Sequence, residues 1–337
     1  SIATCADSNR KVTCSSNPKQ TALHKQIFSY AEKISEMLMP KTKAYYEIWL
    51  DEEKIIDKKD EEDPLYQERY MPRKFKIAIA IPPNNDVDVF GNDIGLIAII
   101  ENEKLLGFNI AIGGGLSTTH GFAETYARLA TVIGFVDSEE KTLKAIYEIL
   151  TVQRDYGNRS DRKLARLKYT IDRLGIDWLK AEVERRLGFT FEEAKSFTFT
   201  SRKDYFGWEQ NNDGLWNYTV FAENGRVLDD ETVALKSALL EVAKTRKVTF
   251  RFTANQNVII SDIKESDKET INKILTDFKI IDHTEGASLV RKNSMACVAL
   301  PTCPLALAEA QRYLPSLISK IENLLDQHQL SNEDIII

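Results

Sequence analysis

The stretch FKIAIAIPPNNDVDVFGNDIGLIAIIENEKLLGFNIAIGGGL, residues 75–116, decides the fold class of this chain. It contains three apolar runs, FKIAIAI, IGLIAIIEN and KLLGFNIAIGGGL, each short enough for a strand. Residues 82–93 lie between the first two runs, and their Pro, Asn and Asp content is typical of a loop. The stretch therefore predicts three strands.

Further elements flank these strands. Residues 21–40, TALHKQIFSYAEKISEMLMP, have apolar side chains at helical spacing and end in a proline. Residues 45–51, YYEIWLD, predict another strand, and helical patterns run from residue 121 to about 187. We expect a mixed α/β domain over residues 1–206.

The pattern changes at Trp216. It predicts, in order, a strand with the turn-forming pair Asn224-Gly225, a helix over 232–246, paired strands over 248–263 and a helix over 268–278. This order suggests a ferredoxin-like α/β half-sandwich over residues 207–284. Residues 285–337 are expected to begin a third α/β domain, truncated where NEDIII (332–337) resembles the start of a strand. The fold class predicted for the whole chain is α+β.

The composition excludes several classes of protein. The 337 residues are 43% apolar and 28% charged, as in ordinary globular proteins. A net charge of −6 argues against nucleic-acid binding, and no stretch approaches the roughly 20 apolar residues of a membrane span. We therefore expect no nucleic-acid and no membrane partner. The acidic run 51–63 predicts a solvated loop.

Four cysteines, Cys5, Cys14, Cys297 and Cys303, are too few for a disulfide scaffold in a chain of this length. They indicate reduced thiols and a cytoplasmic location. Two thiols at the spacing of Cys297 and Cys303, on a loop that enters a helix, can hold iron or zinc, and Pro304 predicts that Cys303 lies at a helix N-terminus. Two small buried residues in a tight loop are the alternative. Cys5 and Cys14 are spaced unlike typical zinc pairs, so they are weak candidates for a completed site.

Two groups of cations are candidate anion sites. Arg159, Arg162, Lys163 and Arg166 follow a cap-like segment at helical spacing, which places them on one helical face suited to carboxylates or phosphates. A solvated basic face is the alternative.

The second group belongs to RKFK (73–76). Lys74 and Lys76 point the same way if this segment is a strand, so they can focus an anion. An edge strand with protective lysines is the alternative. The glycines 113–115 would let the backbone approach a ligand closely, although they do not form the dinucleotide fingerprint. The four histidines show no metal-binding spacing.

Several segments, taken in order, resemble one family over nearly the whole chain. NSMACVALPTCPLALAEAQRYLPS (293–316) is similar to the first cluster-binding segment of bacterial assimilatory sulfite reductase haemoproteins, members of the nitrite and sulfite reductase family. The other matching segments are DSNRKVTCSSNP (7–18), YEIWLDEEK (46–54), MPRKFK (71–76), IGGGLSTTHG (112–121), QRDYGNRSDRKLARLKYT (153–170), ENGRVLD (223–229) and FRFTANQN (250–257). Nitrite reductases share the architecture but match PRKFK and NSMAC less well.

The resemblance implies cofactors and roles. The family joins a sirohaem to a [4Fe–4S] cluster and reduces sulfite to sulfide with six electrons. Cys297 and Cys303 would be two cluster ligands, and the residues around bound sulfite would be Arg10, Lys74 and Lys76. Cofactor contacts would come from Arg159, Arg162, Lys163 and Arg166, and from Arg251, Thr253 and Gln256. Electrons would come from a flavoprotein subunit that uses NADPH, or from ferredoxin.

The chain also departs from the family pattern. The second cysteine motif, which carries the thiolate bridging cluster and sirohaem, is absent from this sequence, as is an N-terminal half-sandwich with its own arginines. We therefore expect an internal fragment that does not reduce sulfite by itself. A nitrite reductase relative, or a cofactor-free protein that binds anions or a partner, are the alternatives.

Overall fold

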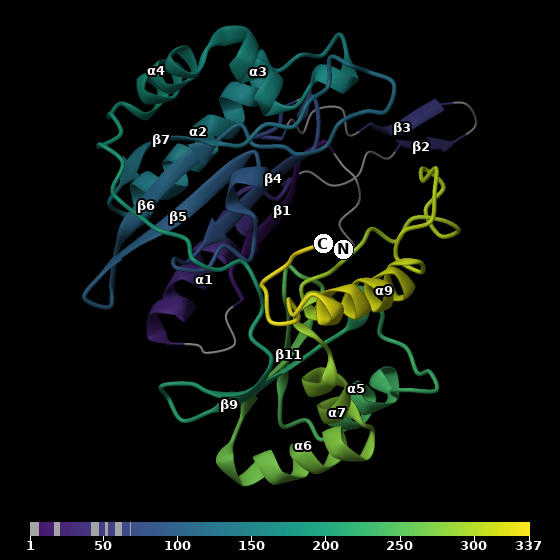
Figure 1. The fold of residues 1–337 in the computed structure, drawn as a ribbon. Helices are drawn as coiled ribbons and strands as arrows, with labels where there is room; N and C mark the ends of the chain where they lie inside the picture. The colour runs from purple at the N-terminus through teal and green to yellow at the C-terminus, as the bar shows by residue number, and fades with distance from the viewer. Residues whose placement is uncertain (1–6, 17–20, 42–46, 51–52, 58–62, 68) are drawn as a thin grey trace. The chain divides into compact units, whose positions relative to one another are not determined.

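The computed structural model describes residues 7–16, 21–41, 47–50, 53–57, 63–67 and 69–337, and within it the chain forms two units. Unit 1 comprises residues 1–15 and 25–202, and unit 2 comprises residues 16–24 and 203–337. Figure 1 shows the two units as ribbons. The division into parts 1–206, 207–284 and 285–337 stays a prediction.

The described part of unit 1 is built on a mixed five-stranded sheet. Its strands, in spatial order, are β1 (Asn9–Cys14), β4 (Phe75–Ala80), β5 (Ile94–Glu101), β6 (Lys104–Ile112) and β7 (Thr131–Val136). The first three are parallel, and β6 and β7 are antiparallel to their neighbours. Strands β4 and β5 are apolar almost throughout because both faces of the sheet are covered, one of them by Phe90, Phe197 and Phe199.

The three strands predicted between residues 75 and 116 are confirmed, but the helical prediction for 121–187 is wrong at β7. Thr131, Val132 and Ile133 are β-branched and fit a pleated sheet better than a helix, and β7 pairs with β6. Strand β1 was not predicted.

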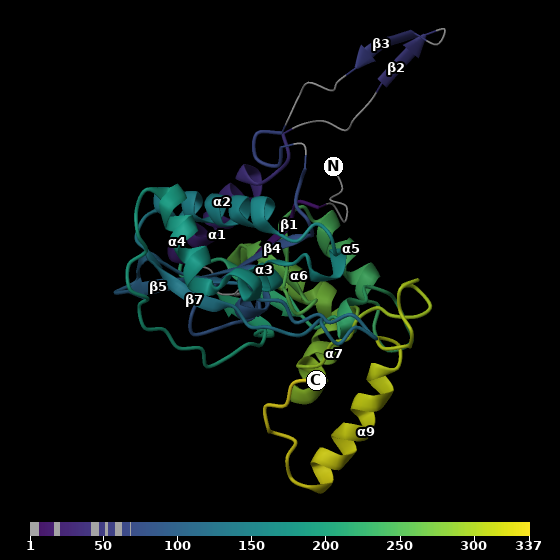
Figure 2. The same cartoon turned by 90° about the horizontal axis from the view of Figure 1, so that it is seen from above.

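Helices cover the sheet of unit 1. The predicted helix over 21–40 is confirmed as α1 (Ala22–Met37), and the others are α2 (Glu139–Tyr156), α3 (Leu167–Leu174) and α4 (Ile176–Leu187). An ion pair of 2.7 Å between Lys33 and Glu139 joins α1 to α2, and both helices can be followed in Figure 2. The Tyr30 ring of α1 packs edge-on against Phe108 of β6, with 4.9 Å between ring centroids.

A separate pair of strands, β2 (Glu47–Leu50) and β3 (Glu53–Asp57), forms a two-stranded antiparallel ribbon. The strand predicted over 45–51 is described at Glu47–Leu50. The acidic run predicted as a loop contains β3, so that prediction is wrong for residues 53–57. Antiparallel pairing with β2 satisfies the backbone of this segment. Residues 51–52 and 58–62 of the run lie outside the described residues.

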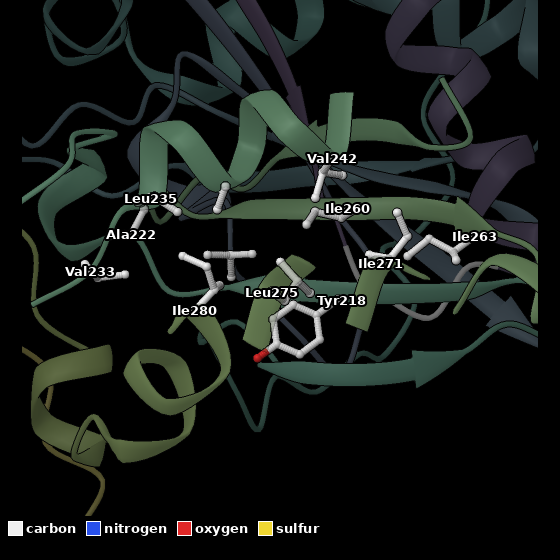
Figure 3. Packing of buried hydrophobic residues seen from close by; sticks show 12 residues of the cluster. Tyr218, Ala222, Val233, Leu235, Val242, Ile260, Ile263, Ile271, Leu275 and Ile280 are labelled. Atoms are coloured by element: carbon white, nitrogen blue, oxygen red, sulfur yellow. The ribbon is translucent and has the colours of Figure 1, made fainter. Parts of the chain in front are cut away.

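Unit 2 contains an antiparallel four-stranded sheet in its described residues. In the spatial order β10-β11-β9-β8, these are β10 (Thr249–Phe252), β11 (Val258–Ile263), β9 (Trp216–Val220) and β8 (Gly207–Gln210). Three helices, α5 (Leu235–Lys244), α6 (Glu265–Asp277) and α7 (Ile280–Gly286), complete it. Figure 3 shows how Tyr218 and Ile260 of the sheet pack with Val242 of α5 and with Ile271 and Leu275 of α6. The predicted α+β class is confirmed.

The last part of unit 2 contains α8 (Leu289–Lys292) and α9 (Leu314–Gln327), which bury Val290, Leu314 and Ile318 together. No strand is assigned over 332–337, although the amide of Met295 donates to the Ile337 carbonyl (3.1 Å) and the Ile337 amide donates to Asn293 (3.3 Å). Among the described residues, every helix is too short or too polar to cross a bilayer.

The core of unit 2 predicts the effect of a truncation. Leu275→Ala removes a fully buried side chain, so we expect the free energy of unfolding to fall by about 2–5 kcal/mol. Leu240→Ala on α5 is the matched control: Leu240 is 53% exposed, and its truncation should change stability by less than about 0.5 kcal/mol. Urea denaturation followed by circular dichroism measures both, and equal losses would contradict this packing.

Candidate functional site

An open cavity of about 490 Å³ in unit 1 is lined largely by cations. The lining residues are Arg73, Lys74, Ser117, Thr118, Thr119, Arg162, Lys163, Arg166, Lys168 and Tyr169. They come from the segment before β4, from the loop after β6 and from the segment that enters α3. Like charges this close repel one another unless anions compensate them, so the partners of each cation determine what the cavity can bind.

Asp93 is the buried counter-ion of this region. Its carboxylate accepts two hydrogen bonds from Arg166, Nε to Oδ1 (3.0 Å) and Nη2 to Oδ2 (2.9 Å), and a third from the backbone amide of Lys76 (2.9 Å). Asp93 is fully buried and the Arg166 side chain is 8% exposed. Burial raises the pKa of Asp93, and the Arg166 guanidinium opposes that shift. Because Nη1 of Arg166 has no hydrogen-bond acceptor within the described chain, it remains available to a ligand in the cavity.

Unlike Arg166, several other cations near the cavity form no ion pair in the described residues. In the described residues, the side chains of Arg10, Arg73, Lys76 and Lys163 make no hydrogen bond or ion pair with any acceptor. Lys163 lies over the Phe122 ring, 2.9 Å from its centroid. Burial lowers the pKa of Arg73, and neighbouring arginines, Arg162 first among them, act in the same direction. Asp7 opposes this shift for Arg73 but forms no ion pair with it. Crowded cations that no ion pair compensates are typical of a site for an anionic ligand.

The predicted sulfite residues lie on adjacent strands. Strands β1 and β4 are parallel with Lys11 opposite Lys76, so Arg10 is placed next to the RKFK segment. Burial lowers the pKa of Lys76 to about 8, and neighbouring cations, Lys74 first among them, contribute in the same direction. The structure thus brings Arg10, Lys74 and Lys76 together in one charged region with Arg166.

The predicted helical stripe over Arg159–Arg166 is wrong. Only a short 3-10 turn, η2 (Arg162–Leu164), lies in this segment, and α3 begins at Leu167. Asn158 accepts hydrogen bonds from the amides of Ser160 and Asp161, and Asp161 accepts one from Lys163. Such side-chain acceptors compete with helical hydrogen bonding. The irregular segment nevertheless places three of the four cations, Arg162, Lys163 and Arg166, in the cavity wall.

Arg162 and Arg159, like Arg166, have partners within the chain. Arg162 makes a two-point ion pair with the Asp7 carboxylate at 2.7 and 2.8 Å. Arg159 does not line the cavity, and its guanidinium donates to the carbonyls of Arg69 (3.1 Å), Tyr70 (2.6 Å) and Arg154 (2.9 Å). Arg159 therefore holds neighbouring backbone in place.

The glycines 113–115 are explained by packing within the chain. A Cβ on Gly114 would lie 2.1 Å from the Phe90 carbonyl oxygen. Gly113 has a φ of +83°, and a Cβ there would lie 2.3 Å from Ile171. The close approach predicted for a ligand is made by the chain itself.

The predicted cofactor residues of unit 2 lie on and after β10. Arg251 donates to Ser261 (2.7 Å) and to Asn217 (3.3 Å), across the face of the sheet. Thr253 is buried and its hydroxyl donates to Asp204 (2.5 Å). Gln256 occupies the following turn with a φ of +70°. Their predicted roles as cofactor contacts stay predictions.

Cys297 is exposed and Cys303 is half-buried, both in the irregular loop before α9. The prediction that Cys303 lies at a helix N-terminus is wrong, because the helix begins only at Leu314. Hydrogen bonds close the loop on itself instead: the Cys303 amide donates to Ala299 (2.8 Å), and the Leu300 amide donates to Ala308 (3.2 Å). In the described residues no three His, Cys, Asp or Glu side chains gather as a metal site. Cys5 lies outside the description.

The turn after β9 anchors the cysteine loop within unit 2. Asn224 accepts a hydrogen bond from the Ala296 amide (3.1 Å), directly before Cys297. Arg226 donates to the Gln311 side chain at 2.8 Å. The sequence predicted a turn here, and side chains of this turn hold the cysteine loop in place through these hydrogen bonds. The sequence did not indicate Asp93 or Lys168, whose buried positions depend on segments distant in the sequence.

Comparisons with known proteins agree on one family. The family model described as nitrite and sulphite reductase 4Fe-4S domain matches residues 29–191, and that described as nitrite/sulfite reductase ferredoxin-like half domain matches residues 208–278. A Leptospira biflexa protein named sulfite reductase (NADPH) hemoprotein beta-component is 63% identical over 337 residues, which are 100% of this chain and 60% of that protein. A protein of the same name from Lysinibacillus sphaericus is 52% identical, over 100% of this chain and 59% of its own length.

The chain thus spans about 60% of the length of the curated relatives it matches. A solved structure, that of the Mycobacterium tuberculosis NirA protein, superimposes with a TM-score of 0.71 at 23% identity, covering 98% of this chain and 54% of that one. At this identity, the structural match establishes the fold.

The thiols of the cofactor-free chain should differ in reactivity. Burial raises the pKa of Cys14 to about 12, so alkylation at pH 8 should be about 10³-fold slower than for an ordinary exposed thiol. Cys297 is exposed and should react first. Iodoacetamide labelling followed by peptide mass spectrometry, in a Cys5→Ser background, measures both rates. Cys297→Ser should abolish the fast phase, and rapid labelling of Cys14 would contradict its burial.

Proposed function

The chain belongs to the nitrite and sulfite reductase family, and from this premise we propose that it forms part of a sulfite reductase haemoprotein. Such a protein reduces sulfite to sulfide with six electrons. The observation that carries the proposal is the set of cations without counter-ions around the cavity of unit 1.

The residues of the cavity fit a sirohaem, a tetrapyrrole rich in carboxylates. Arg73, Lys163 and Nη1 of Arg166 are cations without an acceptor in the described chain, and Arg162 is held only by the carboxylate of Asp7. Carboxylates pair with guanidinium groups through strong, charge-assisted hydrogen bonds. We assign Arg73, Arg162, Lys163 and Arg166 to the cofactor carboxylates, and leave Arg159 with the main chain that it holds.

Cys297 and Cys303 fit the donor chemistry of an iron–sulfur cluster, since both thiols lie on one clamped loop. A [4Fe–4S] cluster usually takes four thiolates, so we assign two of them to this pair. When bound, the sirohaem and the cluster supply electrons to the sulfur atom of sulfite.

The chain's own part in the reaction is charge and proton supply. Sulfite is an anion, and its oxygens must accept protons before they leave as water. Fixed cations at Arg10 and Lys74 stabilise negative charge on these oxygens. Lys76, with a pKa of about 8, is protonated near neutral pH yet acidic enough to donate its Nζ proton to a departing oxygen.

We further propose a flavoprotein subunit as the electron donor, because the matched relatives are named as NADPH-type components. Ferredoxin is the alternative donor. The reduced state expected for the cysteines supports a cytoplasmic location.

Two alternative functions remain distinguishable. A nitrite reductase would turn over nitrite in preference to sulfite on the same protein. A cofactor-free anion-binding protein would carry the same cation-lined cavity but would show no visible absorption when purified from its source cells.

Lys76 provides the test of the proposed function. In the complete haemoprotein purified from source cells, Lys76→Met should lower the rate of sulfite reduction by about 10²- to 10³-fold, since it removes one fixed donor of charge and proton. The wild-type rate should fall as pH rises through about 8, because the protonated form is then lost. Lys76→Arg, which stays protonated, should move this alkaline limb to higher pH.

The control is Lys141→Met, which removes an exposed lysine paired with Asp137 on the surface. It should leave both the rate and the pH profile unchanged. The visible spectrum should be retained in every variant, which separates a lost proton donor from a lost cofactor. Full sulfite reduction by Lys76→Met, or preferential turnover of nitrite, would overturn the proposal.

A further inference from the structure

We propose that Lys168 is a positioning residue, whose buried ammonium shapes the Ser117–Thr119 wall of the cavity so that this wall can receive an anionic ligand. This inference rests on the proposed function of the cavity in unit 1. It gives Lys168 a role different from that of the neighbouring cations, which are available to contact the ligand.

The contacts of Lys168 distinguish it from those cations. Its Nζ donates to the carbonyl of Gly115 (3.0 Å), to that of Ser117 (2.9 Å) and, by a shorter contact, to that of Tyr126. An ammonium group has three donors, so all of its hydrogen-bonding capacity is used within the chain. Lys168 therefore has no donor left for a ligand.

The position of Lys168 agrees with a structural use of its charge. Only 1% of the residue is exposed, and burial lowers its pKa. A buried ammonium is tolerated where acceptors surround it, and here the acceptors are three carbonyls of a single loop. The three carbonyls of the loop thus stabilise the buried ammonium, and the ammonium in turn fixes the positions of these carbonyls.

Other contacts hold the two ends of this loop, among them the packing of the Tyr126 ring against Tyr169, with 5.4 Å between ring centroids. Gly115 and Arg128 exchange two backbone hydrogen bonds, of 2.8 and 3.0 Å, at its base. The Thr119 amide donates to the Thr125 hydroxyl at 2.7 Å. Between these points the segment is irregular and its residues 116–124 are exposed. Lys168 joins Gly115 and Ser117, at the beginning of the loop, to Tyr126 at its end. Lys168 lies two residues after Arg166 in the chain.

The cavity wall follows from this arrangement. Ser117, Thr118 and Thr119 line the cavity together with the cations and offer hydroxyl and amide donors to an anion. Without Lys168 the three carbonyls would lose their shared donor, and the wall would no longer be fixed. An anion would then have to order the loop on binding, which lowers affinity.

The test uses uroporphyrin, a metal-free and fluorescent tetrapyrrole rich in carboxylates, as the probe for the purified 337-residue chain. Lys168→Met should weaken uroporphyrin binding by about 10- to 100-fold, as expected for loss of hydrogen bonds to a charged group. It should also speed amide hydrogen exchange over residues 115–126. Fluorescence titration and exchange mass spectrometry measure the two effects.

The control is Arg73→Met, which removes a positive charge from the same cavity but breaks no side-chain hydrogen bond among the described residues. It should weaken binding while leaving exchange over 115–126 as in the wild type. If Lys168→Met does not fold, Lys168→Gln replaces it. The glutamine keeps an N–H₂ donor group without the positive charge, so it should change binding and exchange in the same directions but by less.

The outcomes separate the two proposals. If the Lys168 variants bind uroporphyrin as tightly as the wild type, or show the same amide exchange over residues 115–126, the role of Lys168 is wrong. The proposed function would still stand. Absence of uroporphyrin binding by the wild type would overturn the proposed use of the cavity and, with it, this inference.

Discussion

The buried ion pair between Asp93 and Arg166 is the constraint on which the candidate site depends. A carboxylate removed from water must be paired and hydrogen-bonded, and Asp93 satisfies this need with Arg166 and with the amide of Lys76. Asp93 immediately precedes β5, Lys76 belongs to β4, and Arg166 directly precedes α3. One carboxylate thus fixes three segments whose side chains carry the positive charge of the site.

Besides the ion-paired Arg162 and Arg166, two groups of cations in unit 1 differ in what they contact. Arg159 and Lys168 donate to main-chain carbonyls and hold irregular segments in place. Arg73, Lys76 and Lys163 have no acceptor among the described residues. A basic composition alone does not distinguish these groups. The distinction comes from hydrogen-bond partners, and it identifies the second group as the one that an anionic ligand would compensate.

The sequence predicts those features that depend on local pattern. Short apolar runs predicted β4, β5 and β6 correctly because buried strands need little beyond continuous apolar side chains. The segment Arg159–Arg166 was predicted as a helix from its charge spacing, yet Asn158 accepts backbone hydrogen bonds in a turn and Asp161 caps only the short 3-10 turn η2. That signal was present in the sequence and pointed to turns.

Other features depend on distant partners and have no local signal. Asp93 is paired with Arg166, 73 residues away in the sequence, and Lys168 donates to Gly115, 53 residues away. Their roles are therefore recognised only once the fold is known. The cysteine loop was predicted to enter a helix, whereas the helix begins at Leu314 and the turn at Asn224 clamps the loop. In both units, long-range hydrogen bonds determine which charged or thiol side chains remain available.

The central claim is that the cavity of unit 1 binds the carboxylates of sirohaem. A crystal structure of the chain with sirohaem added, in which the anomalous scattering of iron locates the cofactor, tests it most directly. We expect cofactor carboxylates in the cavity, in contact with Arg166 and Lys163. A cofactor bound elsewhere, with these side chains in contact only with solvent, would contradict it.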